Sequence, residues 1–397
     1  MTGQPEPNAP SEAGAKSTLR TFAAASFLND LGSDIIYPVW PIFVTTVLKA
    51  NMAALGFLDG LGEALVSLSQ AFSGYYSDKI RRRKIFIWTG YLCGSLSRLG
   101  YAIAAVWPHL IPFRILDRIG KIRSAPRDAM VADLSTAGTR GRNFGLLRTM
   151  DNMGAVLGVI ISIVLLNLVG IRALFALAAI PSLASAGLIF FRVKESRDCR
   201  EKIFRGMRRR DLDRNLRRYF LANAVFALGA FSYSFLLIFA REAGFKTGTL
   251  PVLYLVFTAA AMAFSLPFGK LSDRIGRKPV LYTALGLWAL VCGGFVFGRG
   301  RLPVLIGMFV IYGMHKAALE PVQRTIVSEI CPERFRASAL GAFQMIIGLC
   351  ALPASILAGI LWEQFGAAVP FAVSLILTAA SAAVLAFVKE NRGTSAD

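Results

Sequence analysis

Residues 74–79 read GYYSDK, and residues 269–274, which lie 195 positions later, read GKLSDR. Each copy stands between two apolar blocks of the chain. A second pair of landmarks has nearly the same offset, because Asp133 corresponds to Glu329 at 196 positions. Two independent matches at nearly one offset indicate an internal duplication, so the fold of one half should recur in the other.

Apolar residues make up 55% of the 397 residues, and only 17% are charged. They occur in blocks of about 20 residues, enough for a helix to cross the hydrocarbon core. The blocks lack polar/apolar alternation, and in lipid a helix satisfies its own backbone groups. The predicted fold class is all-α integral membrane, with twelve transmembrane helices in two pseudo-symmetric six-helix bundles. The predicted spans are 20–48, 53–76, 85–106, 110–133, 144–168, 172–192, 219–242, 250–271, 279–298, 303–329, 338–361 and 366–388.

The net charge of +20 is distributed unevenly, because every second loop is rich in Lys and Arg and the opposite loops hold few. This positive-inside pattern predicts that both termini lie in the cytoplasm. It also accounts for the charge, so we expect no nucleic-acid partner. The five cysteines are scattered singly, so we expect no disulfide framework, no metal site and no cofactor.

The domain organisation follows from the duplication and from a charged stretch near the middle of the chain. We predict a disordered cytoplasmic tail at 1–17, a six-helix bundle at 18–192 and a basic cytoplasmic linker at 193–218. A second six-helix bundle at 219–390 and a cytoplasmic tail at 391–397 complete the chain.

The duplicated stretch also resembles a known family. Residues 269–278, GKLSDRIGRK, closely resemble the loop motif that major facilitator superfamily transporters carry between helices 2 and 3 and between helices 8 and 9. Residues 74–83, GYYSDKIRRR, resemble its first copy, with Arg81 where the pattern has glycine. The resemblance covers residues 20 to 390. It implies alternating access and a substrate cavity between the two halves.

The same resemblance implies a gating role for both loops. In the family the loop acid caps a neighbouring helix, and the basic residues meet an acid at the inner end of helix 4 or 10. Asp133 and Glu329 stand at those positions here, with Arg82 and Arg277 as expected partners. The predicted gating residues are Gly74, Asp78, Lys79, Arg82, Asp133, Gly269, Asp273, Arg274, Arg277 and Glu329.

Two further likenesses concern the subfamily. Gly154 and Gly158 resemble the glycine motif of drug–proton antiporters without its usual proline. Two small residues at this spacing also let membrane helices pack closely, and we favour that interpretation. Residues 29–41 resemble the first helix of bacterial efflux-type permeases, a likeness that supplies no substrate.

Away from their ends, the predicted spans of the first half contain fourteen charged residues, seven acidic and seven basic. Mutual neutralisation would explain any single pair. Buried pairs seldom add net stability, however, so the whole set indicates an ion or substrate pathway. We expect Asp34, Glu63, Arg118 and Lys121 to meet at one depth. The predicted coupling and substrate cavity consists of Asp30, Asp34, Glu63, Asp117, Arg118, Lys121 and Asp151.

Span 303–329 is the charged span of the second half. Lys316–Glu320 and Glu320–Arg324 have the i, i+4 spacing of helical ion pairs, which favours a structural role. His315 is interpreted as a packing residue.

These patterns predict a secondary active transporter, with proton-coupled efflux of a small organic solute or drug as the leading function. The alternative is proton-coupled uptake of an anionic metabolite. Two histidines and scattered cysteines offer no catalytic set, so we expect no enzyme. A primary pump would need a phosphate-binding Gly-x-x-x-x-Gly-Lys-Ser/Thr loop, which the sequence lacks. A non-transporting scaffold has no need of the buried charges. We expect a multi-pass monomer in the inner (plasma) membrane.

Overall fold

The computed structural model describes residues 12–80, 82–135, 140–195, 213–298, 302–331 and 336–390. Most of these residues are helical and none of them lies in a strand, which confirms the all-α fold class. The first half contains α1 (Glu12–Ile36), α2 (Trp40–Ile42), the π-helical turn η1 (Phe43–Val47), α3 (Met52–Ile80), α4 (Lys84–Ile103), the 3-10 turn η2 (Trp107–His109), α5 (Leu110–Ile119), the 3-10 turn η3 (Gly120–Arg123), α6 (Ser124–Asp133) and α7 (Arg140–Arg192). The second half contains α8 (Arg214–Gly229), α9 (Tyr233–Glu242), the 3-10 turn η5 (Thr247–Thr249), α10 (Leu250–Ile275), α11 (Arg277–Phe297), α12 (Leu302–Ile330), α13 (Arg336–Phe365) and α14 (Val369–Ala386).

Several predicted spans are interrupted helices. The first predicted span is broken between α1 and α2. Pro38 and Pro41 lie at this break and account for it, because proline lacks the N–H that a helix interior needs. The fourth is divided by η3, and the seventh is divided between α8 and α9. The fifth and sixth form the single element α7. Gly170 has φ 76° inside it, a conformation that glycine adopts readily, and therefore marks the boundary between the two spans.

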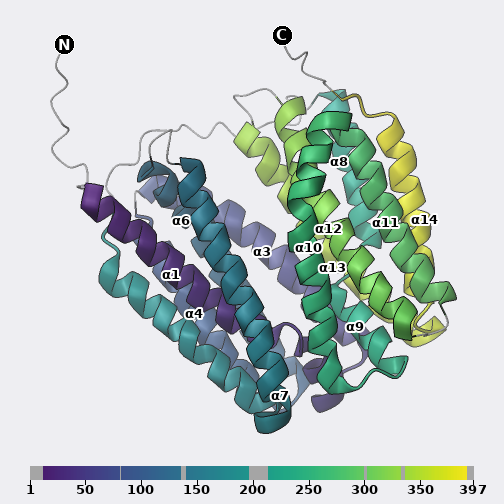
Figure 1. Cartoon of the computed structure of the whole chain (residues 1–397), viewed down its shortest axis with the longest axis horizontal. Coiled ribbons are helices and arrows are strands. Elements are labelled where there is room, and N and C mark those ends of the chain that lie inside the picture. The colour runs from purple at the N-terminus through teal and green to yellow at the C-terminus, as the bar shows by residue number, and fades with distance from the viewer. Residues whose placement is uncertain are drawn as a thin grey trace. The chain divides into compact units, whose positions relative to one another are not determined.

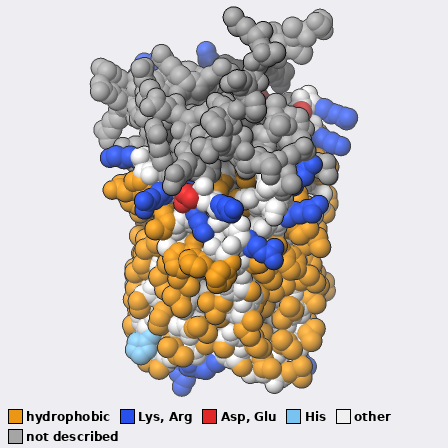
Figure 2. All heavy atoms as spheres, turned by 90° about the vertical axis from the view of Figure 1, so that its left-hand side faces the viewer, with side chains coloured by type: hydrophobic (Ala, Val, Ile, Leu, Met, Phe, Trp, Pro, Cys, Tyr) orange, Lys and Arg blue, Asp and Glu red, His pale blue; other side chains and the backbone are white. Residues whose placement is uncertain are grey.

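Seven segments are long and apolar enough to cross a membrane: Met52–Ser73, Leu146–Arg192, Arg214–Glu242, Thr247–Ile275, Arg277–Phe297, Ala339–Phe365 and Val369–Ala386. The second of these covers two predicted spans. The four predicted spans outside this set carry charged residues within them. On the face drawn in Figure 2, hydrophobic side chains cover most of the surface, and Lys and Arg gather along one edge of it. Such a surface suits contact with lipid tails and headgroups.

The chain divides into two compact units, each made of several chain segments. Unit 1 contains Ser69–Ile103 and the described parts of Met1–Ile36 and Leu116–Lys202. In unit 1, α1 packs along α7, and α7 also packs against α4 (Figure 1). Its buried core includes Phe22, Ala25, Ile87, Tyr91, Met130, Val131, Leu147, Ala186, Ile189 and Val193.

Unit 2 contains Tyr37–Leu68, Ala104–Ile115 and the described part of Ile203–Asp397. Helices α10 and α11 both pack against α12, and α8 packs against α14 (Figure 1). The N-terminal part of α3 belongs to this unit and meets α13 at glycines. A Cβ atom on Gly56 would lie 2.0 Å from the Ser355 carbonyl oxygen, so the two helix backbones are in direct contact.

Candidate functional site

The first candidate residues lie on α1 in unit 1. Asp30 and Asp34 are both half-buried, and Asn29 Nδ2 donates a hydrogen bond of 2.8 Å to Asp30 Oδ1. Helix α7 lies against the same stretch of α1, because a Cβ atom on Gly158 would be 2.4 Å from the Leu31 carbonyl oxygen. This contact confirms that the Gly154–Gly158 pair serves close helix packing.

A mixed charge cluster surrounds Asp151 of α7, which is only 7% exposed. Asp151 interacts electrostatically with Asp30 of α1 and with Arg127 of α6, and Arg148 Nη1 lies 3.9 Å from its Oδ2. Arg127 also lies 3.1 Å from Asp128 Oδ1. The structure therefore brings together two of the predicted cavity residues, Asp30 and Asp151, and adds Arg127 from α6.

Asp117, Arg118 and Lys121 come from α5 and η3, the interrupted fourth span. Arg118 Nε lies 3.4 Å from Asp117 Oδ2. The 3-10 turn allows a close approach to α4, because a Cβ atom on Gly90 would be 2.5 Å from the Gly120 carbonyl oxygen. This approach holds the polar end of α5 against the rest of unit 1.

The four residues expected to meet at one depth are assigned to different units. Asp34, Arg118 and Lys121 belong to unit 1, whereas Glu63 belongs to unit 2. Within unit 2, Glu63 interacts electrostatically with Lys316 of α12. The cationic neighbour found for Glu63 is therefore a second-half residue that the sequence analysis assigned to a structural pair.

Two other intramembrane arginines have structural contacts. Arg98 is 2% exposed and donates hydrogen bonds to Ser33 Oγ at 2.7 Å and to the Asn29 carbonyl oxygen at 3.2 Å, which joins α4 to α1 in unit 1. In unit 2, Arg114 Nη2 lies 2.8 Å from Asp59 Oδ1, and Trp40 Nε1 donates to the same oxygen at 2.9 Å. Both members of this ion pair are buried.

The second motif loop makes the contact expected of it. Arg277 Nε donates a hydrogen bond of 3.1 Å to Glu329 Oε1, and the same guanidinium pairs with Asp273. Lys79, Arg274 and Arg82 are exposed. The surroundings of Gly74 and of the Asp78 side chain lie outside what the structure describes.

The first motif loop differs from the prediction by one residue. Asp133 pairs with Arg83, whose side chain is 7% exposed, whereas the expected partner Arg82 is exposed. Arg83 directly precedes α4, which begins at Lys84, and is buried, whereas Arg82 is exposed to solvent.

Sequence analysis missed two acids at the ends of the halves. In unit 1, Glu195 Oε1 accepts hydrogen bonds from Arg83 N at 2.7 Å and Lys84 N at 3.1 Å, at the start of α4. In unit 2, Glu390 Oε1 accepts a hydrogen bond from Arg277 N at the start of α11. Both acids thereby satisfy free N–H groups at a helix N-terminus. Their signal was present, since 195 positions separate them, the offset of the motif loops.

Comparison with known proteins identifies the family of this chain. The profile of the Major Facilitator Superfamily matches residues 22–251 and 219–397. An uncharacterized MFS-type transporter of Methanocaldococcus jannaschii is 33% identical over 347 residues, covering 85% of this chain and 86% of that protein. The chain belongs to the Major Facilitator Superfamily. The resemblance drawn from the duplicated loop motif is confirmed.

More distant superfamily relatives differ in their described substrates. The multidrug resistance protein MdtH of Photorhabdus laumondii is 24% identical over 332 residues, which cover 80% of each chain. A mutant of the nucleoside transporter NupG has a TM-score of 0.81 at 13% identity and covers 94% of this chain and 100% of its own. A D-xylose-proton symporter has a TM-score of 0.74 at 18% identity, and the match covers 96% of this chain and 99% of the symporter. At these identities the structural likeness shows the superfamily fold alone.

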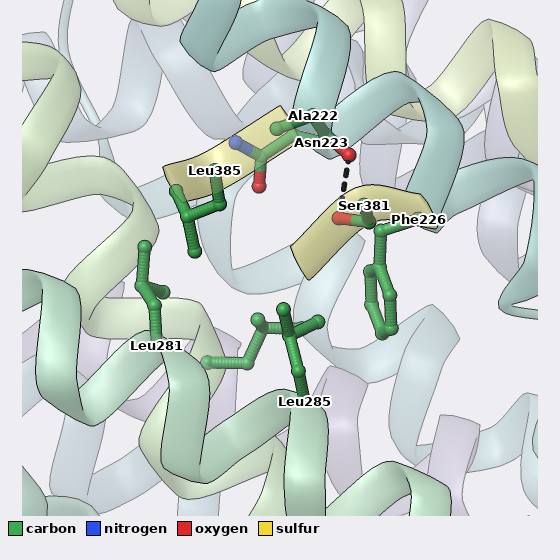
Figure 3. A pocket seen from close by; sticks show the side chains of 8 residues that line it. Ala222, Asn223, Phe226, Leu281, Leu285, Ser381 and Leu385 are labelled. Atoms are coloured by element: carbon green, nitrogen blue, oxygen red, sulfur yellow. Dashed lines mark hydrogen bonds between the residues drawn. The ribbon is translucent and has the colours of Figure 1, made fainter. Parts of the chain in front are cut away.

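Neither of two cavities in the described part of the chain has the form of an enclosed substrate site. One, of about 10 Å³, lies in unit 2 among α8, α11, α12 and α14, and Ser381 Oγ donates a hydrogen bond of 2.8 Å to the Ala222 carbonyl oxygen at its edge (Figure 3). That volume holds about one water molecule. A second, of about 360 Å³, is open to the surface of unit 2. Its lining consists of Thr45, Ala50, Asn51, Met52, Ile238, Arg241, Glu242 and Glu363.

Proposed function

We propose that the chain is a secondary active transporter that works by alternating access and couples the efflux of a small organic solute to protons. Membership of the superfamily supports transport as such. Our proposals for the solute, the direction of transport and the coupling ion are based on the charged residues of unit 1.

The observation that carries the proposal is the cluster around Asp151. It contains three acids, Asp30, Asp128 and Asp151, and two bases, Arg127 and Arg148. When all five are ionised, the cluster holds one uncompensated negative charge. Asp151 itself is buried, and a negative charge within a membrane span is costly unless a cation neutralises it. A proton or a cationic solute group supplies that charge, so binding of one displaces the other, as antiport requires.

Proteoliposomes with an imposed pH gradient test this proposal. We expect the gradient to drive transport of at least one compound from a panel of labelled organic cations and anions. Asp151→Asn should abolish gradient-driven movement of that compound but retain part of its energy-independent exchange. Glu242→Gln, which removes an exposed acid of unit 2, serves as the control. Equal gradient-driven rates in Asp151→Asn and wild-type protein would reject the proton-coupling site.

Uptake of an anionic metabolite is the second candidate, and one observation favours it. No described residue forms a salt bridge with Lys121, which is half-buried on η3 three residues after Arg118. Two cations at adjacent turns suit a carboxylate or phosphate group. In the same assay, movement of anions but not cations, weakened by Lys121→Gln, would favour this candidate over efflux.

We further propose that both termini face the cytoplasm of a cell whose inner (plasma) membrane holds the protein as a monomer. The uneven distribution of Lys and Arg supports this orientation. Single cysteines introduced at positions 6, 206 and 301 of a cysteine-free chain test this orientation. An impermeant thiol reagent should label only position 301 in intact cells. Labelling at position 6 or 206 would contradict the proposed orientation.

A further inference from the structure

The first turns of α8 (Arg214–Gly229) in unit 2 carry three exposed arginines, Arg214, Arg217 and Arg218. Two leucines further along the helix are exposed as well, Leu221 at 55% and Leu228 at 38%. At 100° per residue, these five positions fall within about 100° of arc. One face of α8 is therefore basic at its start and apolar along the rest of its length.

The opposite face of α8 is held in the interior of unit 2. Tyr219 is buried, and its hydroxyl donates a hydrogen bond of 3.1 Å to the Gln323 carbonyl oxygen of α12. Gln323 Nε2 donates in turn to Asn223 Oδ1 at 2.7 Å. Rotation of α8 would leave these buried groups without their hydrogen bonds, which is costly. The face with the arginines therefore remains on the surface of the unit.

The end of α14 (Val369–Ala386) adds a fourth base next to this face. Helices α8 and α14 lie side by side in unit 2 (Figure 1). Asn215 Nδ2 donates a hydrogen bond of 2.7 Å to the Lys389 carbonyl oxygen, and Lys389 N donates one of 2.8 Å to Asn215 Oδ1. Arg218 Nη1 donates to the Phe387 carbonyl oxygen at 3.3 Å. These bonds place Lys389 and Phe387, which are both exposed, beside the arginines of α8.

The two acids next to this cluster along the chain are engaged as helix caps. Asp213 accepts a hydrogen bond of 3.2 Å from Asn215 N at the start of α8, and Glu390 accepts one from Arg277 N at the start of α11. The four bases and these two acids have a net charge of +2 when all are ionised. This end of unit 2 therefore attracts anions.

A neighbouring lysine shows how a purely structural base is placed in the same region. Lys278 Nζ donates hydrogen bonds of 2.8 Å to the Ala386 carbonyl oxygen and 2.9 Å to the Val388 carbonyl oxygen, at the end of α14. Termination of α14 thus accounts for Lys278 and for one bond of Arg218. A guanidinium has five N–H donors, so Arg218 can also bind an anion.

The dimensions of this face match those of one leaflet of a bilayer. Arg214 and Arg218 are four residues apart, about 6 Å along the helix axis, which is about the depth of one headgroup layer. Leu228 lies ten residues beyond Arg218, about 15 Å along the axis, which is about half of the hydrocarbon core. An amphiphile with an anionic headgroup fits both parts at once.

We propose that this face of α8, together with the end of α14, binds one anionic phospholipid. The phosphate and the acidic headgroup contact the three arginines and Lys389, and an acyl chain lies along Leu221 and Leu228. We favour a lipid over free phosphate because the apolar stripe continues directly from the bases. The bound lipid connects the start of α8 to the end of α14. The site requires only a bilayer and does not depend on the proposed solute, direction or coupling ion.

Photoactivatable lipids test the site on the full-length protein in nanodiscs of phosphatidylcholine. One sample contains a small fraction of phosphatidylglycerol with a diazirine in its acyl chain, and the other contains phosphatidylcholine with the same chain. Mass spectrometry after proteolysis should find about tenfold more adducts of the phosphatidylglycerol probe on peptides that contain Leu221 or Leu228, because each base near the headgroup strengthens binding several-fold. Excess inorganic phosphate should leave this ratio unchanged.

Variants make the result specific. Arg214→Gln with Arg217→Gln should bring the ratio of the two probes near one. Arg172→Gln with Lys246→Gln removes the same charge at exposed positions outside the cluster and should leave the ratio unchanged. Arg214→Lys with Arg217→Lys keeps the charge and should retain most of the preference. Equal adducts of both probes in the wild-type protein, loss of the preference in excess phosphate, or the same ratio in the two glutamine pairs would overturn the site.

Discussion

Replacement of two glycines of α7 by alanine separates packing from helix propensity. A Cβ atom at position 158 would lie 2.4 Å from the Leu31 carbonyl oxygen of α1, whereas one at Gly187 meets nothing within 4 Å. Both variants gain up to about 1 kcal/mol of helix propensity, since glycine is the weaker helix former. Only Gly158→Ala must push two backbones apart, and overpacking of that kind costs about 1–3 kcal/mol. We expect Gly158→Ala to be less stable than Gly187→Ala by that amount.

The free energy of unfolding can be measured by titrating each purified variant with SDS in mixed micelles and following helix content. The propensity gain is common to both variants, so their difference isolates the contact with α1. Gly158→Ala should also impair transport, because the same contact holds the backbone of Asp34, whose carbonyl carbon lies 3.2 Å from the added Cβ position. Equal unfolding free energies would show that α1 and α7 are not packed as described.

Two further comparisons concern the motif loops. Arg83→Gln should destabilise the protein by about 1–3 kcal/mol, because it leaves Asp133 without its charged hydrogen bond. Arg82→Gln, at an exposed position, should change the stability little. A double-mutant cycle of each variant with Asp133→Asn measures the coupling energy, and a larger coupling to Arg82 than to Arg83 would contradict the pairing. Glu390→Ala removes the cap of α11 and Glu195→Ala that of α4, and each should lower the free energy of unfolding by about 1 kcal/mol. The neighbouring Lys389→Ala serves as the control. Thermal unfolding of the glutamate variants at the same temperature as the control would exclude the caps.

The fold was predictable because its signals are local and repeated. Apolar blocks of bilayer length placed helical structure in all twelve predicted spans, and the offset of 195 showed the duplication. The breaks were not predictable in the same way. Gly120 begins a 3-10 turn where α4 approaches closely at Gly90, and such a turn depends on a neighbour 30 positions away. The capping roles of Glu195 and Glu390 could have been predicted, because these residues are separated by the same 195 positions as the two motif loops.

The site was predictable only as far as one helix determines it. Spacing of i, i+4 put Asp30 and Asp34 on one face of α1, but it does not tell which cation from another helix approaches them. Helix neighbours decide that choice, so Asp151 of α7 interacts with Asp30 of α1 and with Arg127 of α6, and Glu63 has Lys316 rather than a first-half cation.

Spacing is equally poor at separating structural from functional charges. Asp59 and Arg114 are 55 residues apart and form a closed, buried pair, whereas Lys316 and Glu320 have helical pair spacing and remain exposed at mid-span. Desolvation explains the difference. The charged groups of a buried pair depend on hydrogen bonds within the protein, which hold their side chains in place. The charged groups of an exposed pair are hydrated and can exchange partners. Exposure within a membrane span therefore separates Lys316 and Glu320 from the closed pair Asp59–Arg114, and this difference becomes visible only once the helices are packed.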